Sequence, residues 1–229
     1  MKKKIIIFIG FFLPGINSGG PVRTIHNLIN AFSKDADFYI VTHFSDKNEK
    51  KQYENILLNE WNNIYSCHIF YTNMNRLNKR IIMDLCKGKD AIYVCGCYDK
   101  YSRLILSLTK KKKLNNVFIA SMGNFSRGAL NIKSFKKKCY FAYLKVFGLT
   151  KRIIWSVSNE IEKKQVQTIF PNSKTIVASD IPSFINDERT KKTNEENIQI
   201  LFVGRISRIK NLHFALKVLS YVKAKQSFL

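Results

Sequence analysis

Acidic residues are scarce in this 229-residue sequence, and so are glycine and proline. Sixteen Asp and Glu stand against 39 Lys and Arg, which gives a formal net charge of +23. Ten glycines and 4 prolines exclude a collagen-like or Gly/Pro-rich low-complexity chain. No apolar run approaches the roughly 18 residues that a membrane-spanning helix needs. Since 45% of the residues are hydrophobic, we expect a globular chain whose contact with any membrane is peripheral.

Cysteines are also few. The five cysteines are odd in number and lack paired C-x-x-C spacing. This pattern suggests neither a disulfide framework nor a zinc site. A reducing cytoplasm fits it best, so we expect a cytoplasmic protein.

The excess of positive charge leaves several partners open. Much of it lies in three clusters, Lys2–Lys4, Lys110–Lys113 and Lys136–Lys138. The lysines could simply be solvated, or they could bind an anionic membrane surface, which attracts each nearby lysine by roughly 1 kcal/mol. Nucleic acid is another polyanion, but the sequence has no zinc-finger spacing, RNA-binding signature or helix-turn-helix. We therefore expect no nucleic-acid partner, and either a cytoplasmic location or a peripheral one on the inner face of the cell membrane.

The beginning of the chain resembles a secretory signal, because three lysines precede the apolar run Ile5–Leu13. However, the run ends at Pro14-Gly15, and no small-x-small cleavage site follows promptly. A run that is apolar on both faces also suits a buried parallel strand. We predict a strand at 5–9, a loop at 10–20 and a helix that begins near Pro21.

Strands and helices are predicted to alternate through the first 181 residues. Further strands are predicted at 38–42, 68–71, 91–96, 117–120, 152–157 and 175–178, and helices at 47–60, 75–87, 99–110, 133–147 and 159–170. In the predicted 133–147 helix, the apolar side carries Phe135, Cys139, Tyr140, Tyr143, Leu144 and Phe147, and the opposite face is basic. Such alternation predicts an α/β fold with a doubly wound, Rossmann-like parallel sheet covered on both faces.

The remainder of the chain has a different character. Residues 182–197 are polar and are predicted to form a linker. A second domain then begins at 198–229 with a strand at 198–203, a loop at 204–210 and a helix at 211–225. One strand and one helix cannot close a core, so this unit either docks on the first domain or belongs to a domain that is truncated here.

A glycine-rich loop is the first candidate site. In Asn17-Ser-Gly-Gly-Pro-Val-Arg, Gly19 and Gly20 place backbone amides at the start of a predicted helix. That arrangement favours an anionic or sugar ligand at the carboxyl edge of the sheet. It is neither the G-x-G-x-x-G fingerprint nor a Walker P-loop, so NAD and ATP lose support. An ordinary turn remains the alternative.

Two further loops carry arginine or lysine after a predicted strand. In the segment 121–130, Arg127 could offer its planar guanidinium to a phosphate or a hydroxyl pair. In the segment 202–211, Gly204 and Arg205 follow a strand and Lys210 stands near a helix start, where both cations could meet one diphosphate. Solvated basic loops are the alternative in both places.

The order of these segments resembles a known family. S-G-G-P-V-R, S-R-G-A-L, W-S-V-S-N-E-I-E and L-F-V-G-R-I-S-R-I-K-N-L follow one another along the whole chain. This order is similar to the family-four retaining glycosyltransferases, which have the GT-B architecture of two facing Rossmann-like domains. The last segment, G-R-x-x-x-x-K-N-L between a strand and a helix, is the most specific.

The resemblance implies roles for the matching residues. Gly19 and Gly20 would lie beside the diphosphate and the transferred sugar, with Gly204 in the same donor and acceptor region. Arg205 and Lys210 would act as catalytic cations that hold the diphosphate and stabilise the departing nucleotide. Arg127 would lie in the same cleft. The expected donor is a nucleoside-diphosphate sugar, with no metal and no other cofactor.

The sequence departs from the family in two places. Ser156 stands where many members have histidine in W-H-A-T-S-E, so no histidine role is assigned. The family's E-x7-E element, which binds the donor sugar and ribose, would fall beyond Leu229. Glu162 matches the acidic residue of the W-S-V-S-N-E-I-E segment, with an expected structural role.

The function that the resemblance implies is sugar transfer to a glycan or lipid-linked acceptor in cell-surface polysaccharide biosynthesis. The alternative is a non-catalytic remnant that binds a membrane surface through its basic residues.

Overall fold

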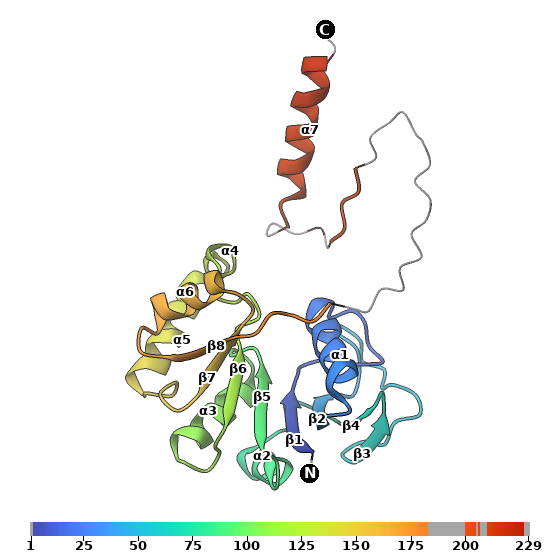
Figure 1. Ribbon diagram of the computed structural model, residues 1–229, viewed down its shortest axis with the longest axis vertical. Helices are drawn as coiled ribbons and strands as arrows, with labels where there is room; N and C mark the ends of the chain where they lie inside the picture. Colours follow the sequence, from blue (N-terminus) through green and yellow to red (C-terminus); the bar gives the residue numbers. More distant parts are fainter. Residues whose placement is uncertain (1, 183–199, 205, 207–209, 227–229) are drawn as a thin grey trace. The chain divides into compact units, whose positions relative to one another are not determined.

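The computed structural model describes residues 2–182, 200–204, 206 and 210–226 (Figure 1). The chain divides into two units, Met1–Ser183 and Phe184–Leu229. The first unit is an α/β fold built on one eight-stranded sheet, and the described part of the second contains helix α7 (Leu212–Gln226). None of the helices that the structure describes combines the length and the apolar character needed to cross a membrane.

The sheet is parallel except at one edge. Its strands are β1 (Lys3–Phe8), β2 (Ala36–His43), β3 (Trp61–Ile64), β4 (Cys67–Thr72), β5 (Ala91–Cys95), β6 (Val117–Ala120), β7 (Ile154–Val157) and β8 (Lys174–Val177). They lie in the order β3-β4-β2-β1-β5-β6-β7-β8, and only β3 and β4 pair in antiparallel fashion. The predicted α/β, Rossmann-like sheet is thus confirmed. The chain winds outward on both sides from β1 and β5, which places a topological switch point between them.

Six helices belong to the first unit: α1 (Gly20–Phe32), α2 (Lys79–Cys86), α3 (Lys100–Lys110), α4 (Arg127–Asn131), α5 (Ser134–Val146) and α6 (Glu160–Ile169). Polar side chains cap the N-termini of several of these helices. Asn78 caps α2 and Asn159 caps α6, each by accepting a hydrogen bond from a backbone amide in the first turn. Pro21 stands in the first turn of α1, where the fixed φ of proline suits a helix.

The two faces of the sheet are covered unequally. Ile6 and Phe8 of β1 pack into a core with α2, α3, α5 and α6, whereas Ile7 packs against α1. Among the described helices, α1 alone covers this second face. Tyr93 of β5 is only partly buried there. The predicted cover on both faces is therefore present but uneven, because the helices that follow β5, β6 and β7 all pack on one side.

The predicted helix at 47–60 was wrong. These residues form turns in which Asn48, Asn55 and Asn59 have positive φ values. The side chain of Asn62 accepts a hydrogen bond from the amide of Leu57 and donates one to the carbonyl of the same residue, each at 2.8 Å. Asparagine tolerates the left-handed region, and its side chain replaces the backbone partner that a helix would supply.

The edge strand β3 and the short helix α4 were not predicted. A two-residue turn, Tyr65-Ser66, joins β3 to β4, and both residues have positive φ. Such turns usually contain Asn-Gly or Asp-Gly, so the sequence carries no clear hairpin signal here. Helix α4 starts where the hydroxyl of Ser126 accepts a hydrogen bond from the amide of Ala129.

The predicted apolar side of the 133–147 helix was only partly correct. Leu144 and Phe141 of α5 are buried against the rest of the first unit. Phe135 is 77% exposed, however, and Cys139 is also exposed. The helix carries apolar residues on two sides, and periodicity alone could not separate them.

In the second unit, the predicted strand at 198–203 was wrong for the residues that the structure describes, because Ile200–Val203 form no strand. The predicted linker beyond residue 182 lies outside the described residues. Helix α7 matches the predicted 211–225 helix closely, and several of its large apolar side chains are exposed, Phe214 and Tyr221 among them.

Candidate functional site

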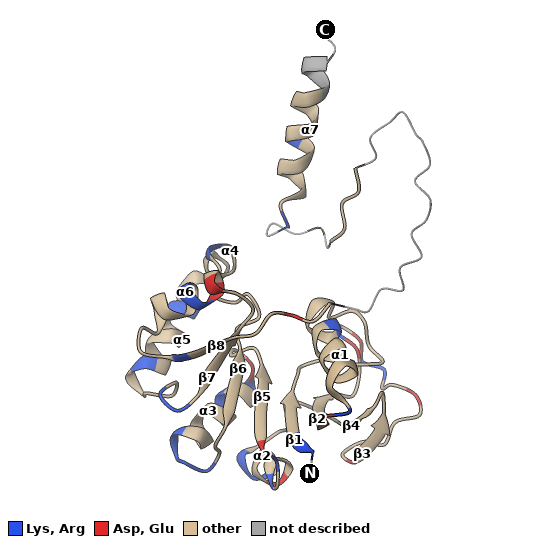
Figure 2. Cartoon of the chain, viewed as in Figure 1, with Lys and Arg blue, Asp and Glu red and all other residues tan. Residues whose placement is uncertain are grey.

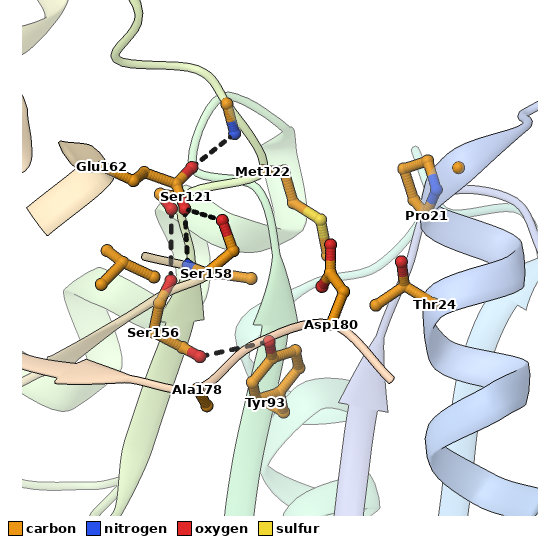
Figure 3. Close-up of a pocket in the computed structure, with 14 residues that line it drawn as sticks. Pro21, Thr24, Tyr93, Ser121, Met122, Ser156, Ser158, Glu162, Ala178 and Asp180 are labelled. Carbon is orange, nitrogen blue, oxygen red and sulfur yellow. Dashed lines mark hydrogen bonds between the residues drawn. The ribbon is translucent and has the colours of Figure 1, made fainter. Parts of the chain in front are cut away.

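A cleft lies at the carboxyl ends of β5, β6, β7 and β8, opposite the N-terminus of α1 (Figure 3). Its volume is about 230 Å³. It is lined by Gly20, Pro21, Thr24, Tyr93, Ala120, Ser121, Met122, Gly123, Ser156, Val157, Ser158, Glu162, Ala178 and Asp180. Ligands of open α/β sheets bind at this edge, beside the switch point. The cleft is therefore the candidate functional site of the first unit.

The wall formed by α1 begins at Gly19 and Gly20, the two glycines predicted to belong to the site. Gly19 is the N-cap with φ of 67°, a value that side chains rarely adopt, so the turn requires glycine. Gly20 lines the cleft. The first turn of α1 has no acidic residue, so its free amides and the positive end of its dipole are not neutralised locally. This wall suits an anionic or hydroxylated ligand.

The loop 10–19 that leads to this wall is held from below by Asp46. The buried Asp46 carboxylate accepts hydrogen bonds from the amides of Ile16 at 2.9 Å and Asn17 at 3.1 Å. A Cβ atom at Gly15 would lie 2.1 Å from the hydroxyl of Tyr53. Glycine is thus required at position 15 for close packing, and the loop has a defined shape.

Glu162 of α6 fixes the opposite wall. Its side chain is buried, and its carboxylate accepts hydrogen bonds from the amides of Gly123 and Ser158, each at 2.7 Å, and from the Ser158 hydroxyl at 3.0 Å. Burial raises the pKa of Glu162, but hydrogen bonds from Ser158, Ser121 and Gly123 outweigh it, and the net pKa is lowered. Glu162 therefore stays ionised and holds the loop after β6 in place, which is a structural role.

Hydroxyl groups form the floor of the cleft. The Tyr93 hydroxyl donates a hydrogen bond to the Ser156 hydroxyl over 3.4 Å, as Figure 3 shows. The Ser121 hydroxyl donates to the carbonyl of Ser156 over 3.2 Å. Burial, more than the neighbouring charges, raises the pKa of Tyr93 to about 12, so its hydroxyl remains protonated. These groups can donate to or accept from a polyhydroxylated ligand without changing charge.

The remaining polar lining residues are Thr24 of α1 and Asp180, which follows β8 (Figure 3). The backbone around Asp180 is tied to α1, because the Asn27 side chain donates a hydrogen bond to the Ile181 carbonyl at 2.8 Å. Asp180 is exposed and adds a second carboxylate, besides that of Glu162, to the lining of the cleft.

The other predicted site residues are divided between the two units. Arg127 is exposed at the start of α4 and does not line the cleft. Gly204 and Lys210 belong to the second unit, and a Cβ atom at Gly204 would lie 3.9 Å from Cδ of Lys210. Arg205 lies outside the described residues. Within the described ranges, no group of three or more His, Cys, Asp or Glu side chains is placed to hold a metal ion.

Sequence reasoning missed several residues of the cleft. Ser156 and Ser158 stand at the end of a predicted strand, so the rule that ligands bind at carboxyl ends could have found them. Tyr93 and Asp180 had no such signal. A tyrosine within an apolar strand and an aspartate in the segment after β8 can be assigned to a site only when the fold brings distant segments together.

Comparison with known proteins adds no relative. No family model matches the chain. No curated protein and no solved structure matches it either. The likeness to glycosyltransferases therefore depends on the motif order alone.

Proposed function

We propose that this protein takes part in glycosyl transfer from a nucleoside-diphosphate sugar to a glycan or lipid-linked acceptor. The observation that carries the proposal is the cleft, in which the uncapped amides of α1 face a floor of protonated hydroxyls. A phosphate fits the first element and a sugar the second. The order of the sequence motifs, from the glycine loop to G-R-x-x-x-x-K-N-L, points to the same chemistry.

In this proposal Gly19 and Gly20 accommodate the diphosphate and the transferred sugar. Side chains there would occupy the approach to the amides, so the proposal requires small residues at both positions. Glu162 does not react in this proposal, since its carboxylate accepts hydrogen bonds from Gly123 and Ser158 and keeps them in position. It is a positioning residue for the Ser121–Gly123 loop.

Arg205 and Lys210 are the proposed catalytic cations. The bond between the anomeric carbon and the diphosphate oxygen breaks, the acceptor oxygen bonds to the same carbon, and the acceptor proton is released. Negative charge grows on the leaving nucleoside diphosphate as this bond breaks. Cations held against it stabilise that charge in the transition state, and no metal ion is required. The donor is the substrate, and the protein needs no other cofactor.

The cleft of the first unit is small for a complete donor. Small-molecule sites usually measure roughly 300–1,000 Å³, against about 230 Å³ here. In the proposal, the first unit therefore holds the transferred sugar and the adjoining phosphates, which are only part of the donor.

Release of nucleoside diphosphate tests this function. The purified protein is incubated with common nucleotide sugars and a membrane extract as acceptor. We expect release with at least one donor, and a loss of about 10²-fold or more in Lys210→Ala, the rough cost of removing one group that stabilises charge in the transition state. Lys217→Ala is the matched control, since Lys217 is an exposed lysine of α7. No release from any donor, or equal losses in both variants, would contradict the proposal.

A further inference from the structure

The middle of the chain contains a long segment without negative charge. Residues 100–159 include 14 Lys and Arg and no Asp or Glu. Figure 2 shows basic residues along α5 and around the turn after α3. The ion pairs of the described residues involve Lys3, Lys51 and Lys163, and none involves α5. The positive charge of α5 is therefore not neutralised within the described part of the protein.

Helix α5 also presents an apolar stripe to the outside. Phe135, Cys139, Ala142 and Val146 recur at i, i+4, i+7 and i+11, a spacing that places them on one helix face. All four are exposed, with Phe135 at 77% and Val146 at 80%. We call these four residues the outward stripe. Because α5 already buries Phe141 and Leu144 on its other side, the outward stripe is not required for its attachment to the sheet.

Lysines flank the outward stripe on both sides. At 100° per residue, Lys138 and Lys145 lie to one side of it and Lys136 to the other. All three are exposed. At the end of the helix the Lys110 ammonium lies 5.9 Å from the ring centre of Phe147, which is itself 51% exposed. That contact brings the second lysine cluster, Lys110–Lys113, beside α5.

Apolar side chains between lysines fit one kind of partner better than others. Nucleic acid would attract the charge, but it gives an apolar stripe little to contact. A membrane of anionic lipid uses both features, because lysines contact lipid phosphates while apolar side chains enter the boundary between headgroups and acyl chains.

We propose that the outward stripe and its flanking lysines dock this protein on an anionic membrane surface, with α5 lying in the plane of the interface. This inference does not depend on the proposed glycosyl transfer, since it concerns a different face and uses none of the cleft residues.

Sedimentation with lipid vesicles tests the docking. The probes are vesicles of phosphatidylcholine alone and vesicles with about one third phosphatidylglycerol. We expect binding only to the anionic vesicles, with an affinity that falls as salt rises. Replacing Lys136, Lys138 and Lys145 by alanine should weaken binding on the order of tenfold or more. The matched control replaces Lys34, Lys50 and Lys87, which are exposed on other elements, and should change binding less than threefold.

Removal of the apolar part is the second test. Phe135→Ser with Val146→Ser keeps every charge and should still reduce vesicle binding about tenfold. Since both side chains are exposed, the variant should remain folded, which circular dichroism checks. Equal losses in the two lysine variants, or full binding by the double serine variant, would overturn the proposal, because net charge alone would then explain the attraction.

The exposed thiol offers a direct view of the interface. Cys139 belongs to the outward stripe, and the other four cysteines are buried, so a polarity-sensitive fluorophore can be attached there selectively. Anionic vesicles should shift its emission to the blue. An unchanged emission in the presence of bound vesicles, a shift caused instead by mixed DNA or RNA, or a concentration-dependent dimer that hides the thiol would each refute membrane docking.

Discussion

The carboxyl edge of the sheet and the outer face of α5 contrast in how they hold their polar groups. Around the cleft, the carboxylates of Glu162 and Asp46 accept hydrogen bonds from backbone amides of the neighbouring loops. On α5, the lysines have no acidic partner among the described residues. A small ligand needs groups fixed in advance, whereas a broad charged surface needs only accumulated charge and exposed apolar area. The two regions therefore suit different partners.

The largest expected change in the free energy of unfolding comes from a comparison of the two sides of α5. Leu144→Ala removes a fully buried side chain and should lower the free energy of unfolding by about 2–5 kcal/mol. Phe135→Ala removes a larger side chain that is 77% exposed and should change it by less than about 0.5 kcal/mol. Urea unfolding measures both. A large loss in Phe135→Ala would mean that the outward stripe serves the fold, and the contrast between the two regions would disappear.

Replacing Glu162 should have the second-largest effect on stability. It should disturb the cleft and leave α5 unchanged. Glu162→Ala leaves the partly buried amides of Gly123 and Ser158 without their acceptor and should lower the free energy of unfolding by about 1.5–3 kcal/mol, the value of a hydrogen bond to a charged group. Glu160→Ala, an exposed position on the same helix, should cost less than about 1 kcal/mol. Vesicle binding should stay unchanged in both variants. Equal stability of the two variants would show that Glu162 does not hold the loop.

The same carboxylate gives a pH dependence. The folded pKa of Glu162 lies below its unfolded value, so its contribution is complete above the unfolded pKa, near about 4.3. It is lost as pH falls through the folded pKa. Between pH of about 6 and 3, unfolding free energy should fall more steeply in the wild type than in Glu162→Gln. Parallel curves would contradict the assigned hydrogen bonds.

The smallest effect should separate two adjacent glycines. Gly19 has φ of +67°, so Gly19→Ala should destabilise by about 1 kcal/mol. Gly20 has an ordinary φ and open space around it, so Gly20→Ala should have little effect on stability. Thermal melts compare the two. If both variants melt alike, the turn before α1 does not depend on a left-handed residue.

The sequence predicted the sheet better than its surroundings. The apolar run Ile5–Ile9 suits a strand that is buried on both faces, and similar runs marked β2, β5 and β6. The turns at 47–60 failed because Asn48, Asn55 and Asn59 decide the backbone locally, while the surrounding apolar residues imitate helical spacing. The hairpin at Tyr65-Ser66 could not be predicted, because it lacks the usual turn residues.

The candidate site could be predicted only in outline. Gly20 of S-G-G-P-V-R lines the cleft, as do Ser156, Ser158 and Glu162 of W-S-V-S-N-E-I-E, so two of the segments that carried the resemblance reach it. Arg127 stands next to the loop after β6 yet lies outside the lining, because Ser126 starts a short helix there. Tyr93 and Asp180 line the cleft because the strand order brings their segments together. Strand order is a tertiary property, and local sequence patterns do not encode it. The outward stripe was missed because both sides of α5 are apolar.

Hydrogen exchange of the whole protein, with and without a nucleoside-diphosphate sugar, tests the central claim most directly. If the cleft binds this donor, amides at 19–24 and 121–124 should exchange more slowly when it is present, while α5 should exchange as before. Unchanged exchange at both cleft segments, at donor concentrations that support release of the diphosphate, would contradict the assignment of the site.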